Sequence, residues 1–255
     1  MAGFVSENSI VRTIWSRSET VLFIFAGAAA EFALNKAVDW LYFTGRLPAD
    51  PLGRLFSTVQ YARRIVFAPE EKALAAIDQI TKIHKSVEAA RGSVIPDWAY
   101  RDVLYLLIHY SIASYELLER RMTDAEKEEL YTVFLRIGTR MGLPGLPPDF
   151  AAWVPSREAH LRSDLARSAW TDDLYLQYRK HLGAFRYFLV RQLQAVLVPE
   201  VARQMLGLQP SLLIRGSVPL YKICYRIGLD KVIKAVLLPA KYKQQVAALD
   251  VPAAN

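Results

Sequence analysis

Apolar residues recur at spacings of three and four along most of this chain, and no segment shows the alternation of a half-buried β-strand. One such apolar face is made of Leu52, Leu55, Val59, Ala62 and Val66. With 255 residues and 53% hydrophobic content, the chain is long enough to bury a large core. We therefore predict an all-α fold, a single-domain helical bundle that covers residues 1–255.

Capping residues indicate where the first predicted helices begin and end. We predict one long helix over residues 18–42. Asp50 and Pro51 then start a second helix, because the aspartate can accept from free backbone N–H groups and proline suits the first helical position. A third helix over residues 70–91 ends at Gly92, since glycine readily adopts the left-handed conformation that follows many helices.

The remaining two thirds of the chain also has a helical pattern. Pro96 and Asp97 open a fourth helix, and its residues 103–118 are apolar on nearly every side, which is typical of a helix at the centre of a bundle. Thr123 and Glu126 form a capping box at the start of the next helix. Two or three more helices are predicted over residues 156–206. Residues 209–255 are predicted to form basic amphipathic helices, a pattern that leaves peripheral membrane contact open.

Composition excludes several classes of protein. The net charge is +7, but the basic residues are spread along the chain without a nucleic-acid-binding motif, so we predict no nucleic-acid partner. The single cysteine, Cys224, excludes an internal disulfide and a cysteine-rich zinc site, and it fits a cytoplasmic location. The apolar run at residues 21–30 is well short of the roughly 20 residues that span a bilayer. We expect it to be a buried helix of a chain that starts at Met1.

The common motifs of nucleotide-binding and hydrolytic enzymes are missing from the sequence. It contains no glycine-rich phosphate loop, no His-Glu-x-x-His and no Gly-x-Ser-x-Gly. None of the four histidines follows a glutamate at a distance of three residues, which argues against a di-iron bundle.

Two histidines, His84 and His109, fall on apolar helix faces. A histidine in such a place is often a core residue whose ring bonds to a backbone carbonyl. A buried imidazole near a buried cation is also what axial ligation of haem requires. Arg54 and Thr58 lie one turn apart at the edge of the apolar face of their helix. These four residues are candidates for a cofactor site, and the structural explanation of the histidines stays open.

Several motifs occur in the same order in one known family. They are Asp50-Pro-Leu-Gly-Arg-Leu-x-x-Thr58, Val66-Phe67, Ile83-His84 with Val87, the apolar helix with His109, Thr123-Asp-x-Glu126 and Met141-Gly-Leu-Pro144. On these motifs, residues 21–208 resemble the family of the rubber oxygenase catalytic domain. This family includes latex-clearing protein and the fungal oxygenase that shortens the prenyl chain of a mycophenolic acid precursor.

The resemblance implies a helical fold around a buried b-type haem, with His84 as the axial ligand of the iron. Arg54 and Thr58 match the polar pair of the haem cavity and are our candidate catalytic residues. We add His109 to the predicted cofactor-binding residues. The implied activity is that of a haem-dependent oxygenase, which uses O2 to cleave or oxidise a small, apolar, isoprenoid-like substrate. The oligomeric state is not predicted.

Some positions depart from the family pattern. Gly27 and Ala28 take the place of a His-Pro pair, so any function of that histidine is missing. Ser57 stands where latex-clearing protein has a lysine, which argues against a lysine-capped iron. The general base is not assigned: Asp39 is the nearest acid by spacing, and Glu31 is an alternative.

Two other functions are compatible with these observations. The first is a non-catalytic haem- or lipid-binding helical protein at a membrane surface, which the basic C-terminal residues favour. The second is a helical interaction module in which the histidines are structural.

Overall fold

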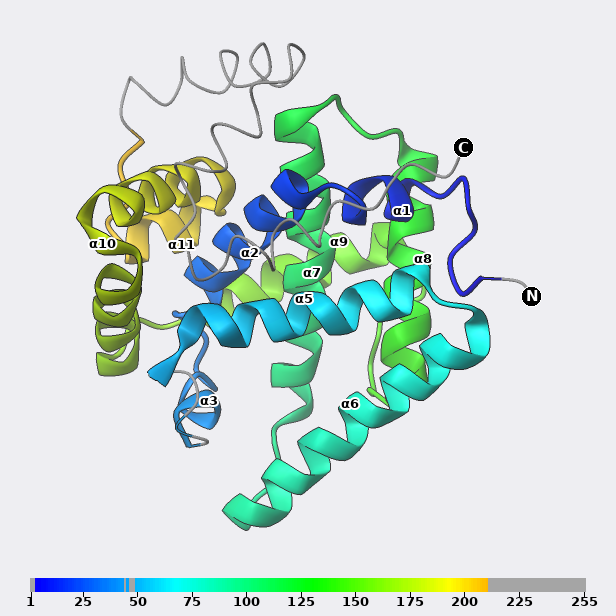
Figure 1. Ribbon diagram of the computed structural model, residues 1–255, viewed down its shortest axis with the longest axis horizontal. Helices are drawn as coiled ribbons and strands as arrows, with labels where there is room; N and C mark the ends of the chain where they lie inside the picture. The colour runs from blue at the N-terminus through cyan, green and yellow to red at the C-terminus, as the bar shows by residue number, and fades with distance from the viewer. Residues whose placement is uncertain (1–2, 44, 46–48, 211–255) are drawn as a thin grey trace.

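The computed structural model describes residues 3–43, 45 and 49–210, and within these ranges the protein is all-helical (Figure 1). Its helices are α1 (Ile10–Trp15), α2 (Ser18–Phe32), α3 (Asp39–Phe43), α5 (Pro51–Phe67), α6 (Glu70–Arg91), α7 (Asp97–Leu118), α8 (Asp124–Arg140), α9 (Phe150–Ser163), α10 (Ala169–Leu197) and α11 (Glu200–Met205). The predicted all-α class is therefore confirmed for these residues. Extended contacts in the described residues are limited to two isolated bridges, Gly3 with Pro69 and Asn35 with Leu165.

Helices α2 and α7 pack against each other along the middle of the molecule (Figure 1). Gly27 of α2 lies directly against the ring of Tyr110 of α7, so a Cβ atom at position 27 would stand 2.2 Å from Cδ1 of that ring. Tyr110 and Ile108 of α7 and Ile24 of α2 are fully buried. The glycine thus lets two central helices approach closely, as small residues do at helix interfaces.

The predicted helix over residues 18–42 is wrong as one continuous element. It divides into α2, which ends at Phe32, and the short α3, which begins at Asp39. Between them, the Asn35 side chain accepts a hydrogen bond from the backbone N–H of Ala37 at 2.7 Å. An asparagine that bonds to its own backbone in this way favours a turn over a helix.

Several predicted helix boundaries are confirmed by their capping contacts. Asp50 accepts a hydrogen bond from the N–H of Gly53 at 3.1 Å, with Pro51 at the first helical position. Gly92 ends α6 in the left-handed conformation with φ of 69°. Thr123 and Glu126 form both bonds of the capping box of α8.

The last helices differ from their prediction in position and shape. Helix α9 begins at Phe150, six residues before the predicted start, because the Asp149 side chain caps it by accepting from the N–H of Ala152 at 2.7 Å. Helix α10 bends at Gly183, whose φ of 74° is not helical. Pro199 separates α10 from α11.

One continuous hydrophobic core joins α1, α2, α5 to α10 and the adjoining turns of the described chain. Within that part of the chain, no helix is both long enough and apolar enough to cross a membrane. The basic helices were predicted for residues 209–255, and of these all but residues 209 and 210 lie outside the described residues.

Candidate functional site

Helices α5 and α6 form two arms of a V that meet at Ala68, and α7 passes behind them (Figure 1). Arg54 lies near the beginning of α5, on the arm's open end. Its Nη1 donates to Oγ1 of Thr58 at 2.9 Å and to Oγ of Ser57 at 3.5 Å. Both hydroxyls also donate to the carbonyl of Arg54, at 3.2 Å and 2.8 Å respectively. The predicted Arg54–Thr58 pair is thus a direct hydrogen bond, which Ser57 joins.

His84 of α6 lies close enough to Arg54 for the two residues to influence each other. Burial lowers the pKa of the His84 imidazole below its ordinary value, the charge of Arg54 lowers it further, and Glu88 opposes both effects. The imidazole is therefore neutral at neutral pH. Its Nδ1 atom is buried and has no hydrogen-bond partner among the described residues. A neutral imidazole with a free ring nitrogen is the form that can bind a metal.

Tyr100, in the first turn of α7, lies against the His84 ring. The two ring centroids are 5.1 Å apart and the rings are tilted by 57°. Tyr100 is itself held by Glu88 of α6, whose Oε1 accepts from the tyrosine hydroxyl at 3.1 Å and from the N–H of Ile95 at 2.9 Å. Glu88 thus fixes the start of α7 to α6, and with it the aromatic wall beside His84.

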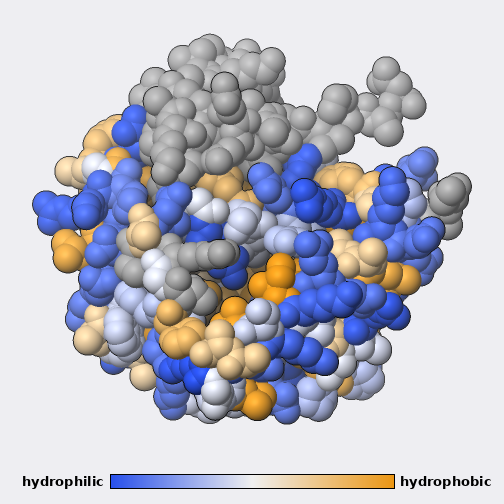
Figure 2. All heavy atoms as spheres, turned by 60° about the horizontal axis from the view of Figure 1, so that its bottom comes forward, coloured by the Kyte–Doolittle hydropathy of each residue, from blue (hydrophilic) through white to orange (hydrophobic). Residues whose placement is uncertain are grey.

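The two helices that carry His84 and Tyr100 also have exposed apolar side chains. These are Ile83 of α6 and Val103 of α7. Figure 2 shows the molecule turned so that the end of α6 and the start of α7 come forward, and apolar residues gather near the middle of this face within a frame of charged residues. Binding of an apolar molecule here would be favourable, because it would remove apolar surface from water.

A second polar centre is buried between α2, α7 and α9. The Oε2 atom of Glu31 accepts from the hydroxyl of Tyr110 at 2.8 Å and from Nη2 of Arg157 at 2.5 Å. Nη1 of the same arginine lies 3.6 Å from Oδ1 of Asp102, and Oδ2 of Asp102 accepts from the amide of Asn35. Two buried carboxylates therefore share one guanidinium. We call these five residues the Arg157 network.

The Arg157 network shifts the pKa of the titratable groups around it. Burial, together with the charge of Glu31, raises the pKa of Asp102 to about 7, and the Arg157 charge only partly offsets this. Burial also lowers the pKa of His109 to about 4, and Arg157 adds to that shift. His109 is thus neutral at neutral pH, with Arg157 and Glu31 as its charged neighbours.

The predicted site residues are therefore divided between two places. Arg54 and Thr58 are hydrogen-bonded to each other on α5, and the charge of Arg54 reaches His84 on α6, whereas His109 lies beside the Arg157 network. The two candidate bases are separated as well: Glu31 belongs to that network, and Asp39 of α3 accepts from Nη2 of Arg91 at 2.6 Å. The structure does not choose between them, and the base stays unassigned.

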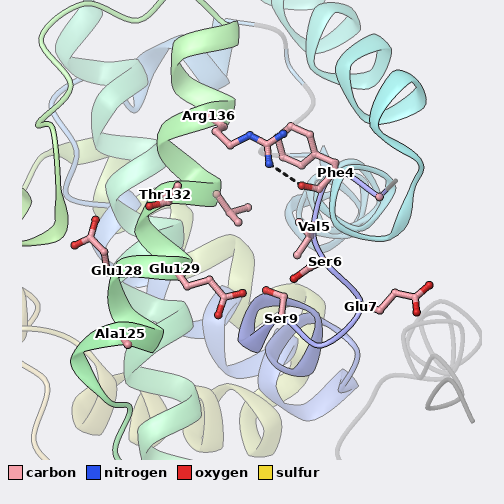
Figure 3. Close-up of a pocket in the computed structure, with 12 residues that line it drawn as sticks. Phe4, Val5, Ser6, Glu7, Ser9, Ala125, Glu128, Glu129, Thr132 and Arg136 are labelled. Carbon is pink, nitrogen blue, oxygen red and sulfur yellow. Dashed lines mark hydrogen bonds between the residues drawn. The ribbon is translucent and has the colours of Figure 1, made fainter. Parts of the chain in front are cut away.

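A groove of about 730 Å³ lies elsewhere, between residues 3–9 and α8. Figure 3 shows Arg136 of α8 pointing to Phe4, whose carbonyl oxygen accepts from its Nη1 at 2.8 Å, while Glu129 points towards Ser9. None of the predicted site residues lines this groove. We therefore assign the candidate site to α5, α6 and α7.

Comparison with known protein families gives one match. The family described as "ER-bound oxygenase mpaB/B'/Rubber oxygenase, catalytic domain" matches residues 14–221. The chain belongs to this family. No curated protein and no solved structure matches the chain. The match extends the predicted range of similarity, residues 21–208, at both ends, and it includes every candidate residue of the site.

In this member of the mpaB/rubber oxygenase family, the structure shows what the two residues singled out in the sequence contact. Gly27 leaves room for the Tyr110 ring that bonds to Glu31. Ser57 accepts a hydrogen bond from Arg54.

Sequence reasoning missed the residues that hold the candidate site and the Arg157 network in place. Asp102 could have been found, since it is a lone acid one residue before the long apolar run of α7. Arg157 follows the buried Trp153 by one helical turn, which places both on one face of α9. Tyr100 and Glu88 have no such signal in the sequence.

Proposed function

We propose that this oxygenase-family chain is a haem-dependent oxygenase that uses O2 to cleave or oxidise a carbon–carbon double bond in a small, apolar, isoprenoid-like substrate. Membership of the family supports oxygenase activity, with O2 and a substrate as the partners. The observation behind the haem is the buried Nδ1 atom of His84, which has no partner among the described residues. The haem dependence and the substrate class are our proposal.

The residues around His84 fit a haem group. Burial and Arg54 keep the imidazole neutral, so a ring nitrogen would be available to hold the iron. Arg54 supplies a cation and Thr58 a hydroxyl on the neighbouring helix, which are the partners that haem propionates require. Tyr100, fixed by Glu88, limits the rotation of the imidazole by packing against its ring.

The chemistry that a bound haem supplies is the activation of O2 at its iron. The chain's own residues have separate tasks. His84 would hold the metal, and the exposed apolar side chains of α6 and α7 would favour an apolar substrate over water. Arg54 and Thr58 form a fixed, charged hydrogen-bond donor pair that can stabilise negative charge on oxygen.

The activity is tested with squalene and its saturated counterpart squalane. Purified, haem-loaded protein in an oxygen electrode should consume O2 with squalene and not with squalane, because only squalene has double bonds. Mass spectrometry should then find carbonyl or epoxide products. Thr58→Val should lower turnover by about tenfold or more, whereas the neighbouring Ser57→Ala should have a smaller effect, since its contact to Arg54 is longer.

Two results would count against the proposal. Equal O2 consumption with squalane would show that the double bond is not the reacting group. Haem that binds through His84 while neither squalene nor shorter isoprenoid alcohols cause O2 consumption would favour the non-catalytic haem-binding alternative.

A further inference from the structure

The outer surface of α10 has exposed apolar side chains on both sides of its bend. Leu176 is 61% exposed, Phe185 63% and Phe188 49%. Phe185 and Phe188 are three residues apart, so they share one helix face. The opposite side of α10 packs in the core through Leu174, Tyr175, Tyr178, Leu182, Ala195 and Leu197.

Basic residues occur among these apolar side chains, and the nearest acidic residues of α10, Asp172 and Asp173, lie one helical turn before Leu176. From residue 174 to residue 199 the sequence has no aspartate or glutamate, and it contains Arg179, Lys180, Arg186 and Arg191. Arg179 and Lys180 are exposed, in the turn between Leu176 and the bend. We call Leu176, Arg179, Lys180, Phe185 and Phe188 the α10 outer face.

The bend that presents this face is fixed by buried hydrogen bonds. The hydroxyl of Tyr175, before the bend, donates to Oε1 of Gln194, after the bend, at 3.0 Å. The Nε2 atom of Gln194 in turn donates to the carbonyl of Ala26 in α2 at 3.0 Å. Because Gln194 is almost completely buried, these bonds are shielded from water. The two halves of α10 are therefore held at a set angle against the core, at one edge of the molecule (Figure 1).

We propose that the α10 outer face binds the surface of an anionic phospholipid bilayer. Phenylalanine and leucine side chains on a basic helix insert below the headgroups, while arginine and lysine pair with the lipid phosphates. A second copy of this chain is a poorer occupant, since a symmetric contact would bring the Arg179–Lys180 pairs together. The basic residues 209–255 have the same sign of charge and are disfavoured for the same reason.

This inference goes beyond the proposed function and does not depend on haem. A bilayer is, however, where apolar molecules accumulate, so a membrane-bound oxygenase would meet an isoprenoid-like substrate there at high local concentration.

The test is sedimentation of the full chain with vesicles. Vesicles of three parts phosphatidylcholine and one part phosphatidylserine should bind the protein, and vesicles of phosphatidylcholine alone should bind it much less. Phe185→Ser/Phe188→Ser should lower the partition coefficient by roughly tenfold or more, because two partly exposed aromatic side chains are removed from the contact. Arg179→Glu/Lys180→Glu should lower binding to the anionic vesicles only.

The matched control replaces two exposed valines outside the α10 outer face. Val94 and Val154 are 75% and 40% exposed, and Val94→Ser/Val154→Ser should leave vesicle binding unchanged. Far-UV circular dichroism shows whether each variant remains folded. Unchanged binding in both the phenylalanine and the charge variants would overturn the proposal. So would a result in which the phenylalanine variant abolishes a dimer in size-exclusion chromatography and leaves vesicle binding intact.

Discussion

The contact between Gly27 and Tyr110 makes a sharp prediction about the middle of the fold. In Gly27→Ala, the added Cβ atom would lie 2.2 Å from Cδ1 and 2.3 Å from Cε1 of the tyrosine ring, whereas ordinary contacts begin near 3.4 Å. The ring must move by about 1 Å to relieve this overlap. Tyr110 is fully buried and its hydroxyl lies 2.8 Å from Oε2 of Glu31, so such a movement also weakens that hydrogen bond.

The expected cost of Gly27→Ala is the sum of three effects on the free energy of unfolding. Overpacking a buried site costs about 1–3 kcal/mol. Loss of a hydrogen bond to a charged group costs about 1.5–3 kcal/mol. Alanine favours a helix over glycine by about 1 kcal/mol, which offsets part of the cost. The net destabilisation is about 1.5–5 kcal/mol, or a fall in Tm of about 3–20 °C for a chain of this size.

Thermal and urea unfolding followed by far-UV circular dichroism measure this cost. Tyr110→Phe serves as the companion variant, because it keeps the ring and removes the hydroxyl. In that background, Gly27→Ala should cost only the overpacking part, less the gain from the higher helix propensity of alanine. A Gly27→Ala protein that melts at or above the wild-type temperature would refute the close contact between α2 and α7.

Three further predictions concern pH and helix capping. The pKa of Asp102 is raised to about 7 in the folded protein, so its contribution to stability is present at low pH and is lost as pH rises through about 7. In unfolding titrations, Asp102→Asn should therefore gain stability relative to wild type as the pH rises from about 4 to 7. The pKa of His109 is instead lowered to about 4, so its contribution to stability is present above about pH 6.5 and is lost as pH falls towards 4. His109→Gln should therefore gain stability relative to wild type over that acid range. Parallel curves of unfolding free energy against pH for the two proteins would contradict the burial of the ring. Thr123→Ala should cost about 1 kcal/mol in urea unfolding, because it removes the N-cap oxygen of α8, and a neutral result would argue against the capping box.

Local signals in the sequence were sufficient for much of the fold. Asp50, Gly92, Thr123 and Glu126 act through contacts within a few residues of themselves, so their patterns predict helix ends correctly. The break at Asn35 was missed because its decisive contacts are both local and distant. Its side chain accepts from Ala37 nearby and also donates to Asp102 of α7, which only the folded chain brings close.

The candidate site was predictable only in part. Arg54 and Thr58 are one turn apart, so helical spacing alone places them together. The proximity of His84 depends on how α6 folds back beside α5, and the resemblance to the family supplied that expectation. On α7, Tyr100 faces His84, whereas His109 lies beside Arg157. Because α7 is apolar on most sides, its sequence does not show which residue faces which neighbouring helix.

The central claim is that His84 is the axial ligand of a bound haem, and the absorption spectrum of the purified protein tests it most directly. After titration with haem, the wild-type protein should show a Soret band that shifts on reduction and addition of CO. His84→Ala should lose most of that band, and His181→Ala, a histidine of α10 away from the site, should keep it. Wild-type protein without a Soret band in the presence of ample haem, or a His84→Ala spectrum equal to that of the wild type, would contradict the account.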